Sequence, residues 1–181
     1  MKAAVFYDVK DIKLEDVPEP EIGDEDVLVE VAACGICGSD LEYYLGRSPV
    51  GTPDGKGPLI LGHEFSGRVV KLGKGVDTLA EGDRVAVNPI QSVAGGDLSR
   101  SGNPHFDLST VLGVTTNGGF AQFVRTKADH AYKLPDSMTD AQGAFVEMLA
   151  ASLNAVEKAD IQLGDLVVLY GPGPVGLSML Q

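Results

Sequence analysis

The apolar residues of this chain fall in short runs separated by glycine- and proline-rich stretches. The clearest early run is Val-Leu-Val-Glu-Val-Ala at 27–32, which is rich in the β-branched residues that favour strands. Further strands are predicted at 1–6, 12–16, 65–72, 84–87, 120–125 and 131–134, with a short helix at 39–45 and a loop at 47–58. Many short strands with turn residues between them are typical of a closed barrel or a sandwich.

The pattern changes after Pro135, where the apolar spacing becomes helical. Thr139 is followed three residues later by Gln142, which is the spacing of a capping box at a helix start. Apolar residues then recur at helical spacing, at Phe145, Leu149, Leu153 and Val156. One or two helices are therefore predicted to lead out of the β region and to end near residue 158.

A second change follows at 165–170, a continuous apolar run of the kind found in buried parallel strands. It leads directly into Gly171-Pro-Gly-Pro-Val-Gly176 and the apolar start of a helix. In that context G-x-G-x-x-G indicates dinucleotide binding: Gly171 allows the turn, Gly173 admits the pyrophosphate, and Gly176 allows close helix packing. The acidic residue that separates NAD from NADP is expected about 20 residues further on, beyond Gln181, so either cofactor fits.

Composition narrows the function classes. The formal net charge of −12 argues against a nucleic-acid or anionic-membrane partner, because both need a basic surface. No apolar run approaches the ~18 residues of a membrane span. The chain has two cysteines, Cys34 and Cys37, and this pair predicts a reducing, cytoplasmic compartment and a metal or redox role rather than a disulfide framework.

The candidate chemistry lies in Cys34-Gly-Ile-Cys-Gly-Ser-Asp40 and in Gly62-His63-Glu64. Thiolate and imidazole are both good Zn²⁺ ligands, and catalytic zinc sites use three protein ligands and an open position. A thioredoxin-like redox pair is the alternative for the two cysteines, but it leaves the histidine motif and the glycine motif unexplained. His105 and His130 have no comparable context and are predicted to be surface loop residues.

These motifs, together with Gly82-Asp-Arg-Val85, Asn117-Gly-Gly-Phe120 and Glu147, occur in the order found in zinc-dependent medium-chain alcohol and polyol dehydrogenases. The chain resembles the sorbitol, butanediol and threonine dehydrogenase branch of that family over essentially its whole length. The resemblance implies a mainly β fold with helices. A GroES-like β-barrel catalytic domain at 1–154 is expected to precede a truncated Rossmann (α/β) fragment at 155–181.

The resemblance also implies a ligand set for the zinc. It places Zn²⁺ on Cys37, His63 and Glu147, with Glu64 as a second-sphere or alternate ligand and Cys34 packed nearby. Relatives often have proline after the glutamate at 147, where this chain has methionine. A solvated glutamate at a helix end is the alternative interpretation of that position.

The resemblance assigns roles to the residues around the zinc as well. Asp40 is expected to orient His63 through its second ring nitrogen, as outer partners of zinc ligands do. Ser39 is expected to hydrogen-bond the alcohol oxygen and to begin a proton relay to solvent. Many relatives carry histidine where this chain has Glu42, so the outer part of that relay stays open.

A second, structural zinc is common in the family, in a lobe with four cysteines. The matching region here is 88–107, and the cysteine positions are taken by Val93, Gly96, Ser99 and Asp107. The resemblance therefore implies one catalytic zinc and no structural zinc.

The implied function is oxidation of a secondary alcohol to a ketone, with hydride transfer to NAD or NADP. The substrate is expected to be a small alcohol or polyol in a pocket shaped by Tyr43, Tyr44 and the loop 47–58. The truncated cofactor domain predicts that this chain is inactive alone, and the full-length enzyme is expected to be a homo-oligomer. Two other interpretations stay open: a non-catalytic GroES-like module that holds zinc or binds a partner, and a zinc-free protein like the quinone reductases.

Overall fold

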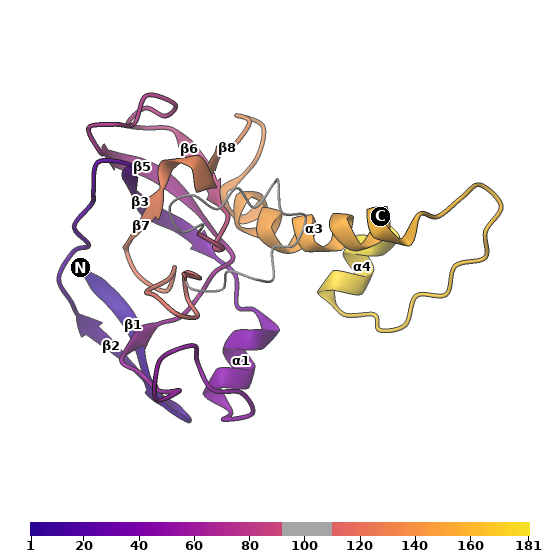
Figure 1. The fold of residues 1–181 in the computed structure, drawn as a ribbon, viewed down its shortest axis with the longest axis horizontal. Coiled ribbons are helices and arrows are strands. Elements are labelled where there is room, and N and C mark those ends of the chain that lie inside the picture. Colours follow the sequence, from indigo (N-terminus) through magenta and orange to yellow (C-terminus); the bar gives the residue numbers. More distant parts are fainter. Residues whose placement is uncertain (92–109) are drawn as a thin grey trace.

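The computed structural model of the chain describes residues 1–91 and 110–181 (Figure 1). Within those ranges it contains two antiparallel sheets and three α-helices. The larger sheet has the order β7-β3-β5-β6-β8, with bounds Phe123–Lys127, Asp26–Cys34, Phe65–Leu72, Arg84–Val87 and Ala131–Lys133. The smaller sheet has the order β2-β1-β4, with bounds Asp11–Asp16, Lys2–Asp8 and Leu59–Ile60. The predicted mainly β fold is confirmed.

The main core lies on the larger sheet. Its central strands place alternate β-branched and aromatic side chains on one face, and these form one buried cluster that includes Val27, Val29, Phe65, Val69 and Val85. The two sheets are joined through the segment before β7. Phe120 packs against clusters on the smaller sheet, and Ala121 forms an isolated bridge with Ala3 of β1.

Gly67 of β5 pairs with Val31 of β3, beside an irregularity in the β3 register. A Cβ atom at Gly67 would lie 2.1 Å from the Glu30 carbonyl oxygen and 2.7 Å from a Val29 methyl carbon. No side chain fits there without moving the backbone, so glycine sets the spacing of these strands.

The helix α3 (Asp140–Ala159) is anchored to the barrel at its first turn. The Thr139 side chain accepts from the Gln142 backbone N–H, and Gln142 accepts from the Thr139 backbone N–H, so the predicted capping box is confirmed. Arg84 of β6 pairs with Asp140 at 2.9 Å, and the Ser66 hydroxyl of β5 donates to the Asp140 carbonyl oxygen at 2.6 Å. From this anchor α3 runs outward from the barrel (Figure 1), past residue 154, where the predicted domain boundary lies.

The buried face of α3 differs from the one that the apolar spacing marks. Phe145, Leu149 and Leu153 are exposed, and the buried residues are Gly143, Ala144, Met148 and Ser152. The reason is the close approach of the helix to β5. A Cβ atom at Gly143 would lie 2.8 Å from Ser66 Cβ, so only small residues fit at this contact.

The strand predicted at 165–170 is not formed, and that expectation was wrong. Leu166, Val168 and Tyr170 are exposed, and no strand within 1–91 or 110–181 pairs with this segment. A strand requires a neighbour to satisfy its backbone N–H and C=O groups, and apolar sequence alone does not supply one. This segment is instead part of an extended loop that leads into α4 (Pro174–Leu180), and α4 packs against α3 (Figure 1).

Three smaller predictions also need correction or fall outside the structure. The strand predicted from 120 begins at Phe123, because residues 118–120 donate backbone hydrogen bonds to the carbonyls of 60–62 instead. His130 is buried in the 3-10 turn η1 (Ala128–His130) and is not a surface loop residue. His105 and the four residues at the cysteine positions of the structural zinc lobe lie outside the described ranges.

No helix in the described part of the chain combines the length and the apolar character that crossing a bilayer requires.

The tight contact at Gly67 predicts that Gly67→Ala destabilises the protein by roughly 1–3 kcal/mol, because the added methyl overpacks a backbone contact. Gly38→Ala is the matched control, since a Cβ atom there meets nothing within 4 Å. It lies in the first turn of a helix, so its effect should be neutral or slightly stabilising. Urea denaturation of both variants measures the difference, and equal stabilities would contradict this account of the strand spacing.

Candidate metal centre

The centre is built where the β3–β5 ladder ends. The last pair of that ladder is Cys34 with Phe65, and the Gly35 backbone N–H donates to the Glu64 carbonyl oxygen at 2.7 Å. Because the strands are antiparallel, the residues that follow β3 and those that precede β5 leave the sheet together. This brings Cys37, at the start of helix α1 (Gly38–Tyr44), beside His63 and Glu64.

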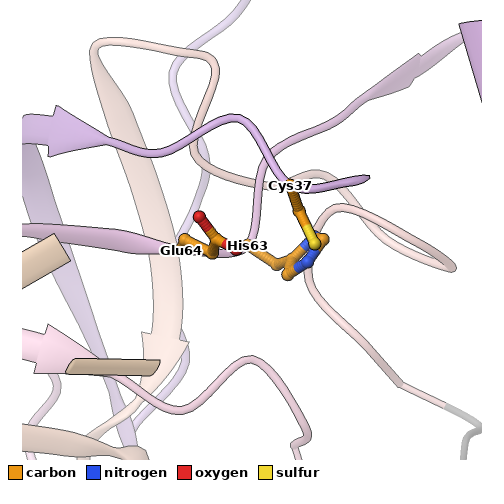
Figure 2. Close-up of side chains that lie close together, drawn as sticks. All are labelled: Cys37, His63 and Glu64. Atoms are coloured by element: carbon orange, nitrogen blue, oxygen red, sulfur yellow. The ribbon is translucent and has the colours of Figure 1, made fainter. Parts of the chain in front are cut away.

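Three potential metal ligands converge at this point. The Cys37 sulfur, a His63 ring nitrogen and a Glu64 carboxylate oxygen all lie within 4.8 Å of one another. Figure 2 shows the Cys37 sulfur against the His63 ring, with Glu64 beside it. Zinc bonds of about 2.0–2.3 Å in a tetrahedral site place neighbouring ligand atoms roughly 3.3–3.8 Å apart, so a small contraction would close this set around a Zn²⁺ ion.

Asp40 holds the two ligand-bearing loops together. Its carboxylate is 3% exposed, and it accepts hydrogen bonds from the Cys37 N–H at 2.9 Å and from the Gly62 N–H at 3.2 Å. Burial raises the pKa of Asp40, and the two backbone hydrogen bonds together with the charge of His63 oppose that shift. One carboxylate thus fixes the backbone on both sides of the site.

Gly62 is required for this arrangement. Its φ of +88° lies in the region that side chains other than glycine rarely adopt. A Cβ atom there would also lie 2.6 Å from the Phe120 ring and 2.9 Å from the Cys34 sulfur. Because Gly62 has no side chain, its backbone can lie against the Phe120 ring and the Cys34 sulfur and still donate its N–H to Asp40.

His63 is 8% exposed and has different neighbours on its two ring nitrogens. Nε2 lies 3.4 Å from the Ser39 hydroxyl oxygen. Nδ1 lies 3.9 Å from Asp40 Oδ1, and it has no hydrogen-bond partner among the described residues. Asp40 therefore lies beside the ring nitrogen that the resemblance implies, but 3.9 Å is too long for the predicted hydrogen bond.

The pKa of His63 reflects its acidic surroundings. Burial lowers it, but a hydrogen bond with Cys37 and the charges of Asp40, Cys37 and Glu147 outweigh burial, so the net shift is upward. Three carboxylates and a thiol around one imidazole form a site with excess negative charge, which a bound divalent cation would balance.

The two cysteines have opposite environments. A hydrogen bond with His63 lowers the pKa of Cys37, against the opposing effect of burial. Burial raises the pKa of Cys34 to about 12, and the charges of Asp40 and Glu64 add to that effect. The Cys34 sulfur packs against the core and donates weakly to the Gly35 carbonyl oxygen at 3.5 Å. Cys37 is therefore the thiol suited to metal binding.

Glu147 faces the site from α3, one helical turn after Gly143. Burial raises its pKa, and the charge of His63 opposes the shift while that of Glu64 adds to it. Its carboxylate is thus close enough to interact with both residues. In the described structure, however, the compact donor group contains Glu64 and does not contain Glu147.

The alcohol dehydrogenase GroES-like domain model matches residues 23–136, which include every strand of the larger sheet, Cys37 and both residues of the His63-Glu64 pair.

The chain belongs to the alcohol dehydrogenase GroES-like family.

Relatives in this family are similar over nearly the whole chain. The (R,R)-butanediol dehydrogenase of Bacillus subtilis is 38% identical, with 100% of this chain and 54% of that protein aligned. The sorbitol dehydrogenase of the same organism is 36% identical over 98% of this chain and 50% of its own length. A solved structure from Sinorhizobium meliloti, described as a zinc-binding dehydrogenase bound to NADP, superposes with a TM-score of 0.87 at 35% identity, covering 99% of this chain and 52% of that one. The chain therefore spans about half the length of the relatives it matches.

The glycine motif of this GroES-like family member lies apart from the metal centre. Gly171 has a φ of +106°, Gly173 caps the start of α4, and a Cβ atom at Gly176 would lie 2.0 Å from the Gly171 carbonyl oxygen. This tight turn is the conformation that the three glycines predict. Without a strand at 165–170, however, the turn stands beside no sheet in the described structure.

The structure brings Cys37, His63 and Glu64 within 4.8 Å of one another, with Ser39 and Asp40 beside them and Glu147 outside this donor group. Sequence reasoning predicts all six as site residues. It missed the bond from Asp40 to the Gly62 N–H. Spacing along one strand carries no signal for a contact between two loops. Tyr43, expected in a substrate pocket, packs partly buried against the cluster formed by Phe6, Val50, Leu59 and Leu61.

The contrast between the two cysteines predicts selective alkylation. In metal-free protein, iodoacetamide should modify Cys37 at a lower pH than an ordinary thiol and should leave Cys34 unmodified in the folded state. His63→Ala should move the alkylation of Cys37 to higher pH, because the hydrogen bond that lowers its pKa is lost. Mass spectrometry of tryptic peptides across a pH series measures this, and modification of Cys34 at the same rate would contradict it.

Proposed function

We propose that this chain is the catalytic domain of a zinc-dependent, NAD(P)-linked alcohol or polyol dehydrogenase. The observation that supports the proposal is the convergence of Cys37, His63 and Glu64 within 4.8 Å. Family membership adds to it, because the matched relatives are named for butanediol and sorbitol oxidation. The reaction proposed is oxidation of a small secondary alcohol to a ketone, in a homo-oligomeric full-length enzyme.

Two carboxylates compete for the third ligand position beside Cys37 and His63. Glu147 is the one that the family resemblance implies, and since burial makes its charged form costly, that charge needs a nearby cation. Glu64 is already within reach of the other two donors. We assign the third position to Glu147 and an alternate or outer position to Glu64, and the variants below separate the two.

When bound, Zn²⁺ supplies Lewis-acid polarisation that makes a hydroxyl group more acidic. The Ser39 hydroxyl, next to His63 Nε2, can accept a hydrogen bond from a substrate hydroxyl and pass its proton toward solvent. Glu42 lies one turn along α1, on the solvent side, where it pairs with Arg47 at 3.2 Å. Asp40 keeps the Cys37 and His63 loops fixed during this step, because both of its backbone hydrogen bonds remain in place.

Hydride transfer to nicotinamide belongs to the cofactor. We assign the pyrophosphate contact to the turn formed by Gly171, Gly173 and Gly176. The side chains beside this turn at 166–170 are exposed, and no described strand supports them. A dinucleotide needs the walls of a complete sheet as well as the turn. We therefore propose that the chain by itself binds the cofactor weakly and has no turnover.

The ligand assignment predicts how zinc content responds to substitution. Purified protein should hold one zinc per chain, Cys37→Ala should lose it, and Cys34→Ala is the matched control that should keep it. Glu147→Gln should weaken zinc binding more than the roughly 10–100-fold typical of an outer partner, and Glu64→Gln should stay within that range. Elemental analysis and competition with a chromogenic chelator measure these values.

Three outcomes would contradict these expectations. Full zinc content in Cys37→Ala would remove the proposed centre altogether. A larger loss in Glu64→Gln than in Glu147→Gln would make Glu64 the third ligand. Two tightly bound zincs per chain would overturn the expected absence of a structural zinc.

The cofactor assignment predicts that the chain alone binds NAD⁺ and NADP⁺ with Kd values above about 1 mM by calorimetry. A chimera that continues this chain with the second half of the Bacillus subtilis (R,R)-butanediol dehydrogenase should bind NAD⁺ and oxidise members of a diol and sugar-alcohol series. Cys37→Ala in the chimera should abolish that activity, and Cys34→Ala should retain it. Micromolar NAD⁺ binding by the chain alone would contradict the first part. A chimera that binds zinc and NAD⁺ but oxidises no alcohol would favour a non-catalytic module.

A further inference from the structure

Arg84 belongs to the motif Gly82-Asp-Arg-Val85, to which the proposed function assigns no role. It begins β6, and its guanidinium group reaches the start of α3. Nε donates to Asp140 Oδ1 at 3.0 Å, and Nη2 lies 2.9 Å from the same oxygen. Nη2 also donates to the carbonyl oxygen of Met138, in the segment before the helix. One side chain therefore binds both the first residue of α3 and the backbone that leads into it.

The backbone of Arg84 holds the same connection at its other end. Its carbonyl oxygen accepts a hydrogen bond from the Leu134 N–H at 2.8 Å, directly after β8 ends. The segment 135–139 is thus fixed to one residue at both of its ends. The Arg84 side chain is 20% exposed and that of Asp140 is 47% exposed, so water screens part of their attraction. For that reason the ion pair adds little stability, and the geometry that it fixes is the more important effect.

The first turn of α3 also lies directly on the larger sheet. The Ser66 hydroxyl of β5 donates to the Asp140 carbonyl oxygen at 2.6 Å. A Cβ atom at Gly143 would lie 2.4 Å from Leu134 Cδ1 and 2.8 Å from Ser66 Cβ. Contact with these side chains stops the helix from moving closer to the sheet, and the bonds from Arg84 stop it from moving away. The position of α3 on the sheet is therefore set at its first turn.

Farther along, α3 packs against α4. The Ser152 hydroxyl donates to the Val175 carbonyl oxygen at 3.4 Å, and the Ser178 hydroxyl oxygen lies 3.6 Å from the Met148 sulfur. Figure 1 shows α4 beside the far part of α3, away from both sheets. These contacts join the two helices to each other, so they leave the orientation of α3 on the sheet to the anchored turn.

Glu147 lies on the same side of α3 as this anchored turn. It follows Asp140 by seven residues, which places the two positions roughly 20° apart around the helix axis and about 10.5 Å apart along it. A tilt of the helix by about 10° at Asp140 would move position 147 by about 1.8 Å. Ligand distances at a metal are fixed to within about 0.2 Å, so such a tilt would separate this carboxylate from a bound ion. Glu147 is close enough to His63 for their charges to interact.

We propose that Arg84 is a positioning residue of the metal centre. It holds the first turn of α3 against β5 and β6, and it thereby sets the distance from Glu147 to a zinc ion held by Cys37 and His63. Arg84 acts only through the helix, since its own contacts are with Met138, Asp140 and the Leu134 N–H. The inference rests on the proposed function, because it takes Glu147 as the third ligand.

Zinc affinity tests the proposal. Arg84→Met keeps an apolar stem but removes the donors, and it should weaken Zn²⁺ binding about tenfold, at the low end of the range for outer partners. Arg84→Lys keeps the charge without the planar fork and should weaken binding about threefold. Arg68→Met is the matched control, because Arg68 is the cross-strand partner of Arg84 and its Nη1 donates to the Gly82 carbonyl oxygen at 2.6 Å instead. It should bind Zn²⁺ as the parent does, in competition with a chromogenic chelator.

A double-mutant cycle separates positioning from a structural role. In a Glu147→Gln background, Arg84→Met should change Zn²⁺ affinity by less than about twofold, because the group through which it acts is gone. Its effect on stability, measured by urea denaturation of zinc-free protein, should be the same in both backgrounds. If Arg84→Met does not fold, Asp140→Ala takes its place in the cycle, because it breaks the same contact from the more exposed side.

The outcomes distinguish this proposal from the proposed function. Parent-like Zn²⁺ affinity in Arg84→Met and Asp140→Ala, with a loss in Glu147→Gln, would overturn the role of Arg84 and leave the ligand assignment standing. Equal weakening by Arg84→Met with and without the Glu147 carboxylate would overturn it too, because Arg84 would then act by another route. An equal loss in Arg68→Met would have the same meaning. Unchanged affinity in Glu147→Gln would overturn the ligand assignment, and the role of Arg84 with it.

Discussion

The metal centre depends on the buried carboxylate of Asp40, which accepts from the Cys37 N–H and the Gly62 N–H at the same time. The loops that carry the thiol and the imidazole come from different parts of the chain, and in the described structure this carboxylate joins them directly. A buried charge is costly unless it is hydrogen-bonded, and here the two backbone donors and the nearby imidazole oppose the effect of desolvation, although the pKa of Asp40 remains raised. The Asp40 carboxylate, which joins the two loops, also adds negative charge to the site. The contact that holds the loops therefore also makes the candidate site suited to a cation.

The rest of the barrel positions these loops through close backbone contacts. Gly67 lets β3 and β5 pair tightly up to Cys34 and Phe65, and the site begins where that pairing ends. Gly143 lets α3 lie directly on β5, which carries Glu147 to the edge of the same site one turn later. Both contacts use the absence of a side chain, and both set distances among polar groups several residues away. Packing and chemistry are therefore coupled through the spacing of the backbone.

Sequence reasoning located most of the strands of the larger sheet and the capped start of α3, and its predicted metal ligands include the three donors that converge in the structure. Those features depend on local periodicity, on capping spacing and on short motifs, each of which is visible along the chain. The features that it missed are relations between segments. The apolar spacing of Phe145 and Leu149 predicts a helix but not its buried face, which includes Gly143 and Ala144 because α3 lies close to β5. The run at 165–170 has strand composition, yet strand formation depends on a neighbour that the run itself does not encode.

The opposite environments of the two cysteines decide where oxidative damage falls. Peroxides attack thiolates and spare protonated thiols. Cys34, with a pKa of about 12 and a place in the core, is protected by both its protonation and its packing. Cys37 is half-buried, and its pKa is lowered by His63, so it is the thiol that an oxidant reaches. Oxidative stress would therefore inactivate the metal centre while the barrel around it stays folded, and a bound cation that occupies the sulfur would act as its shield.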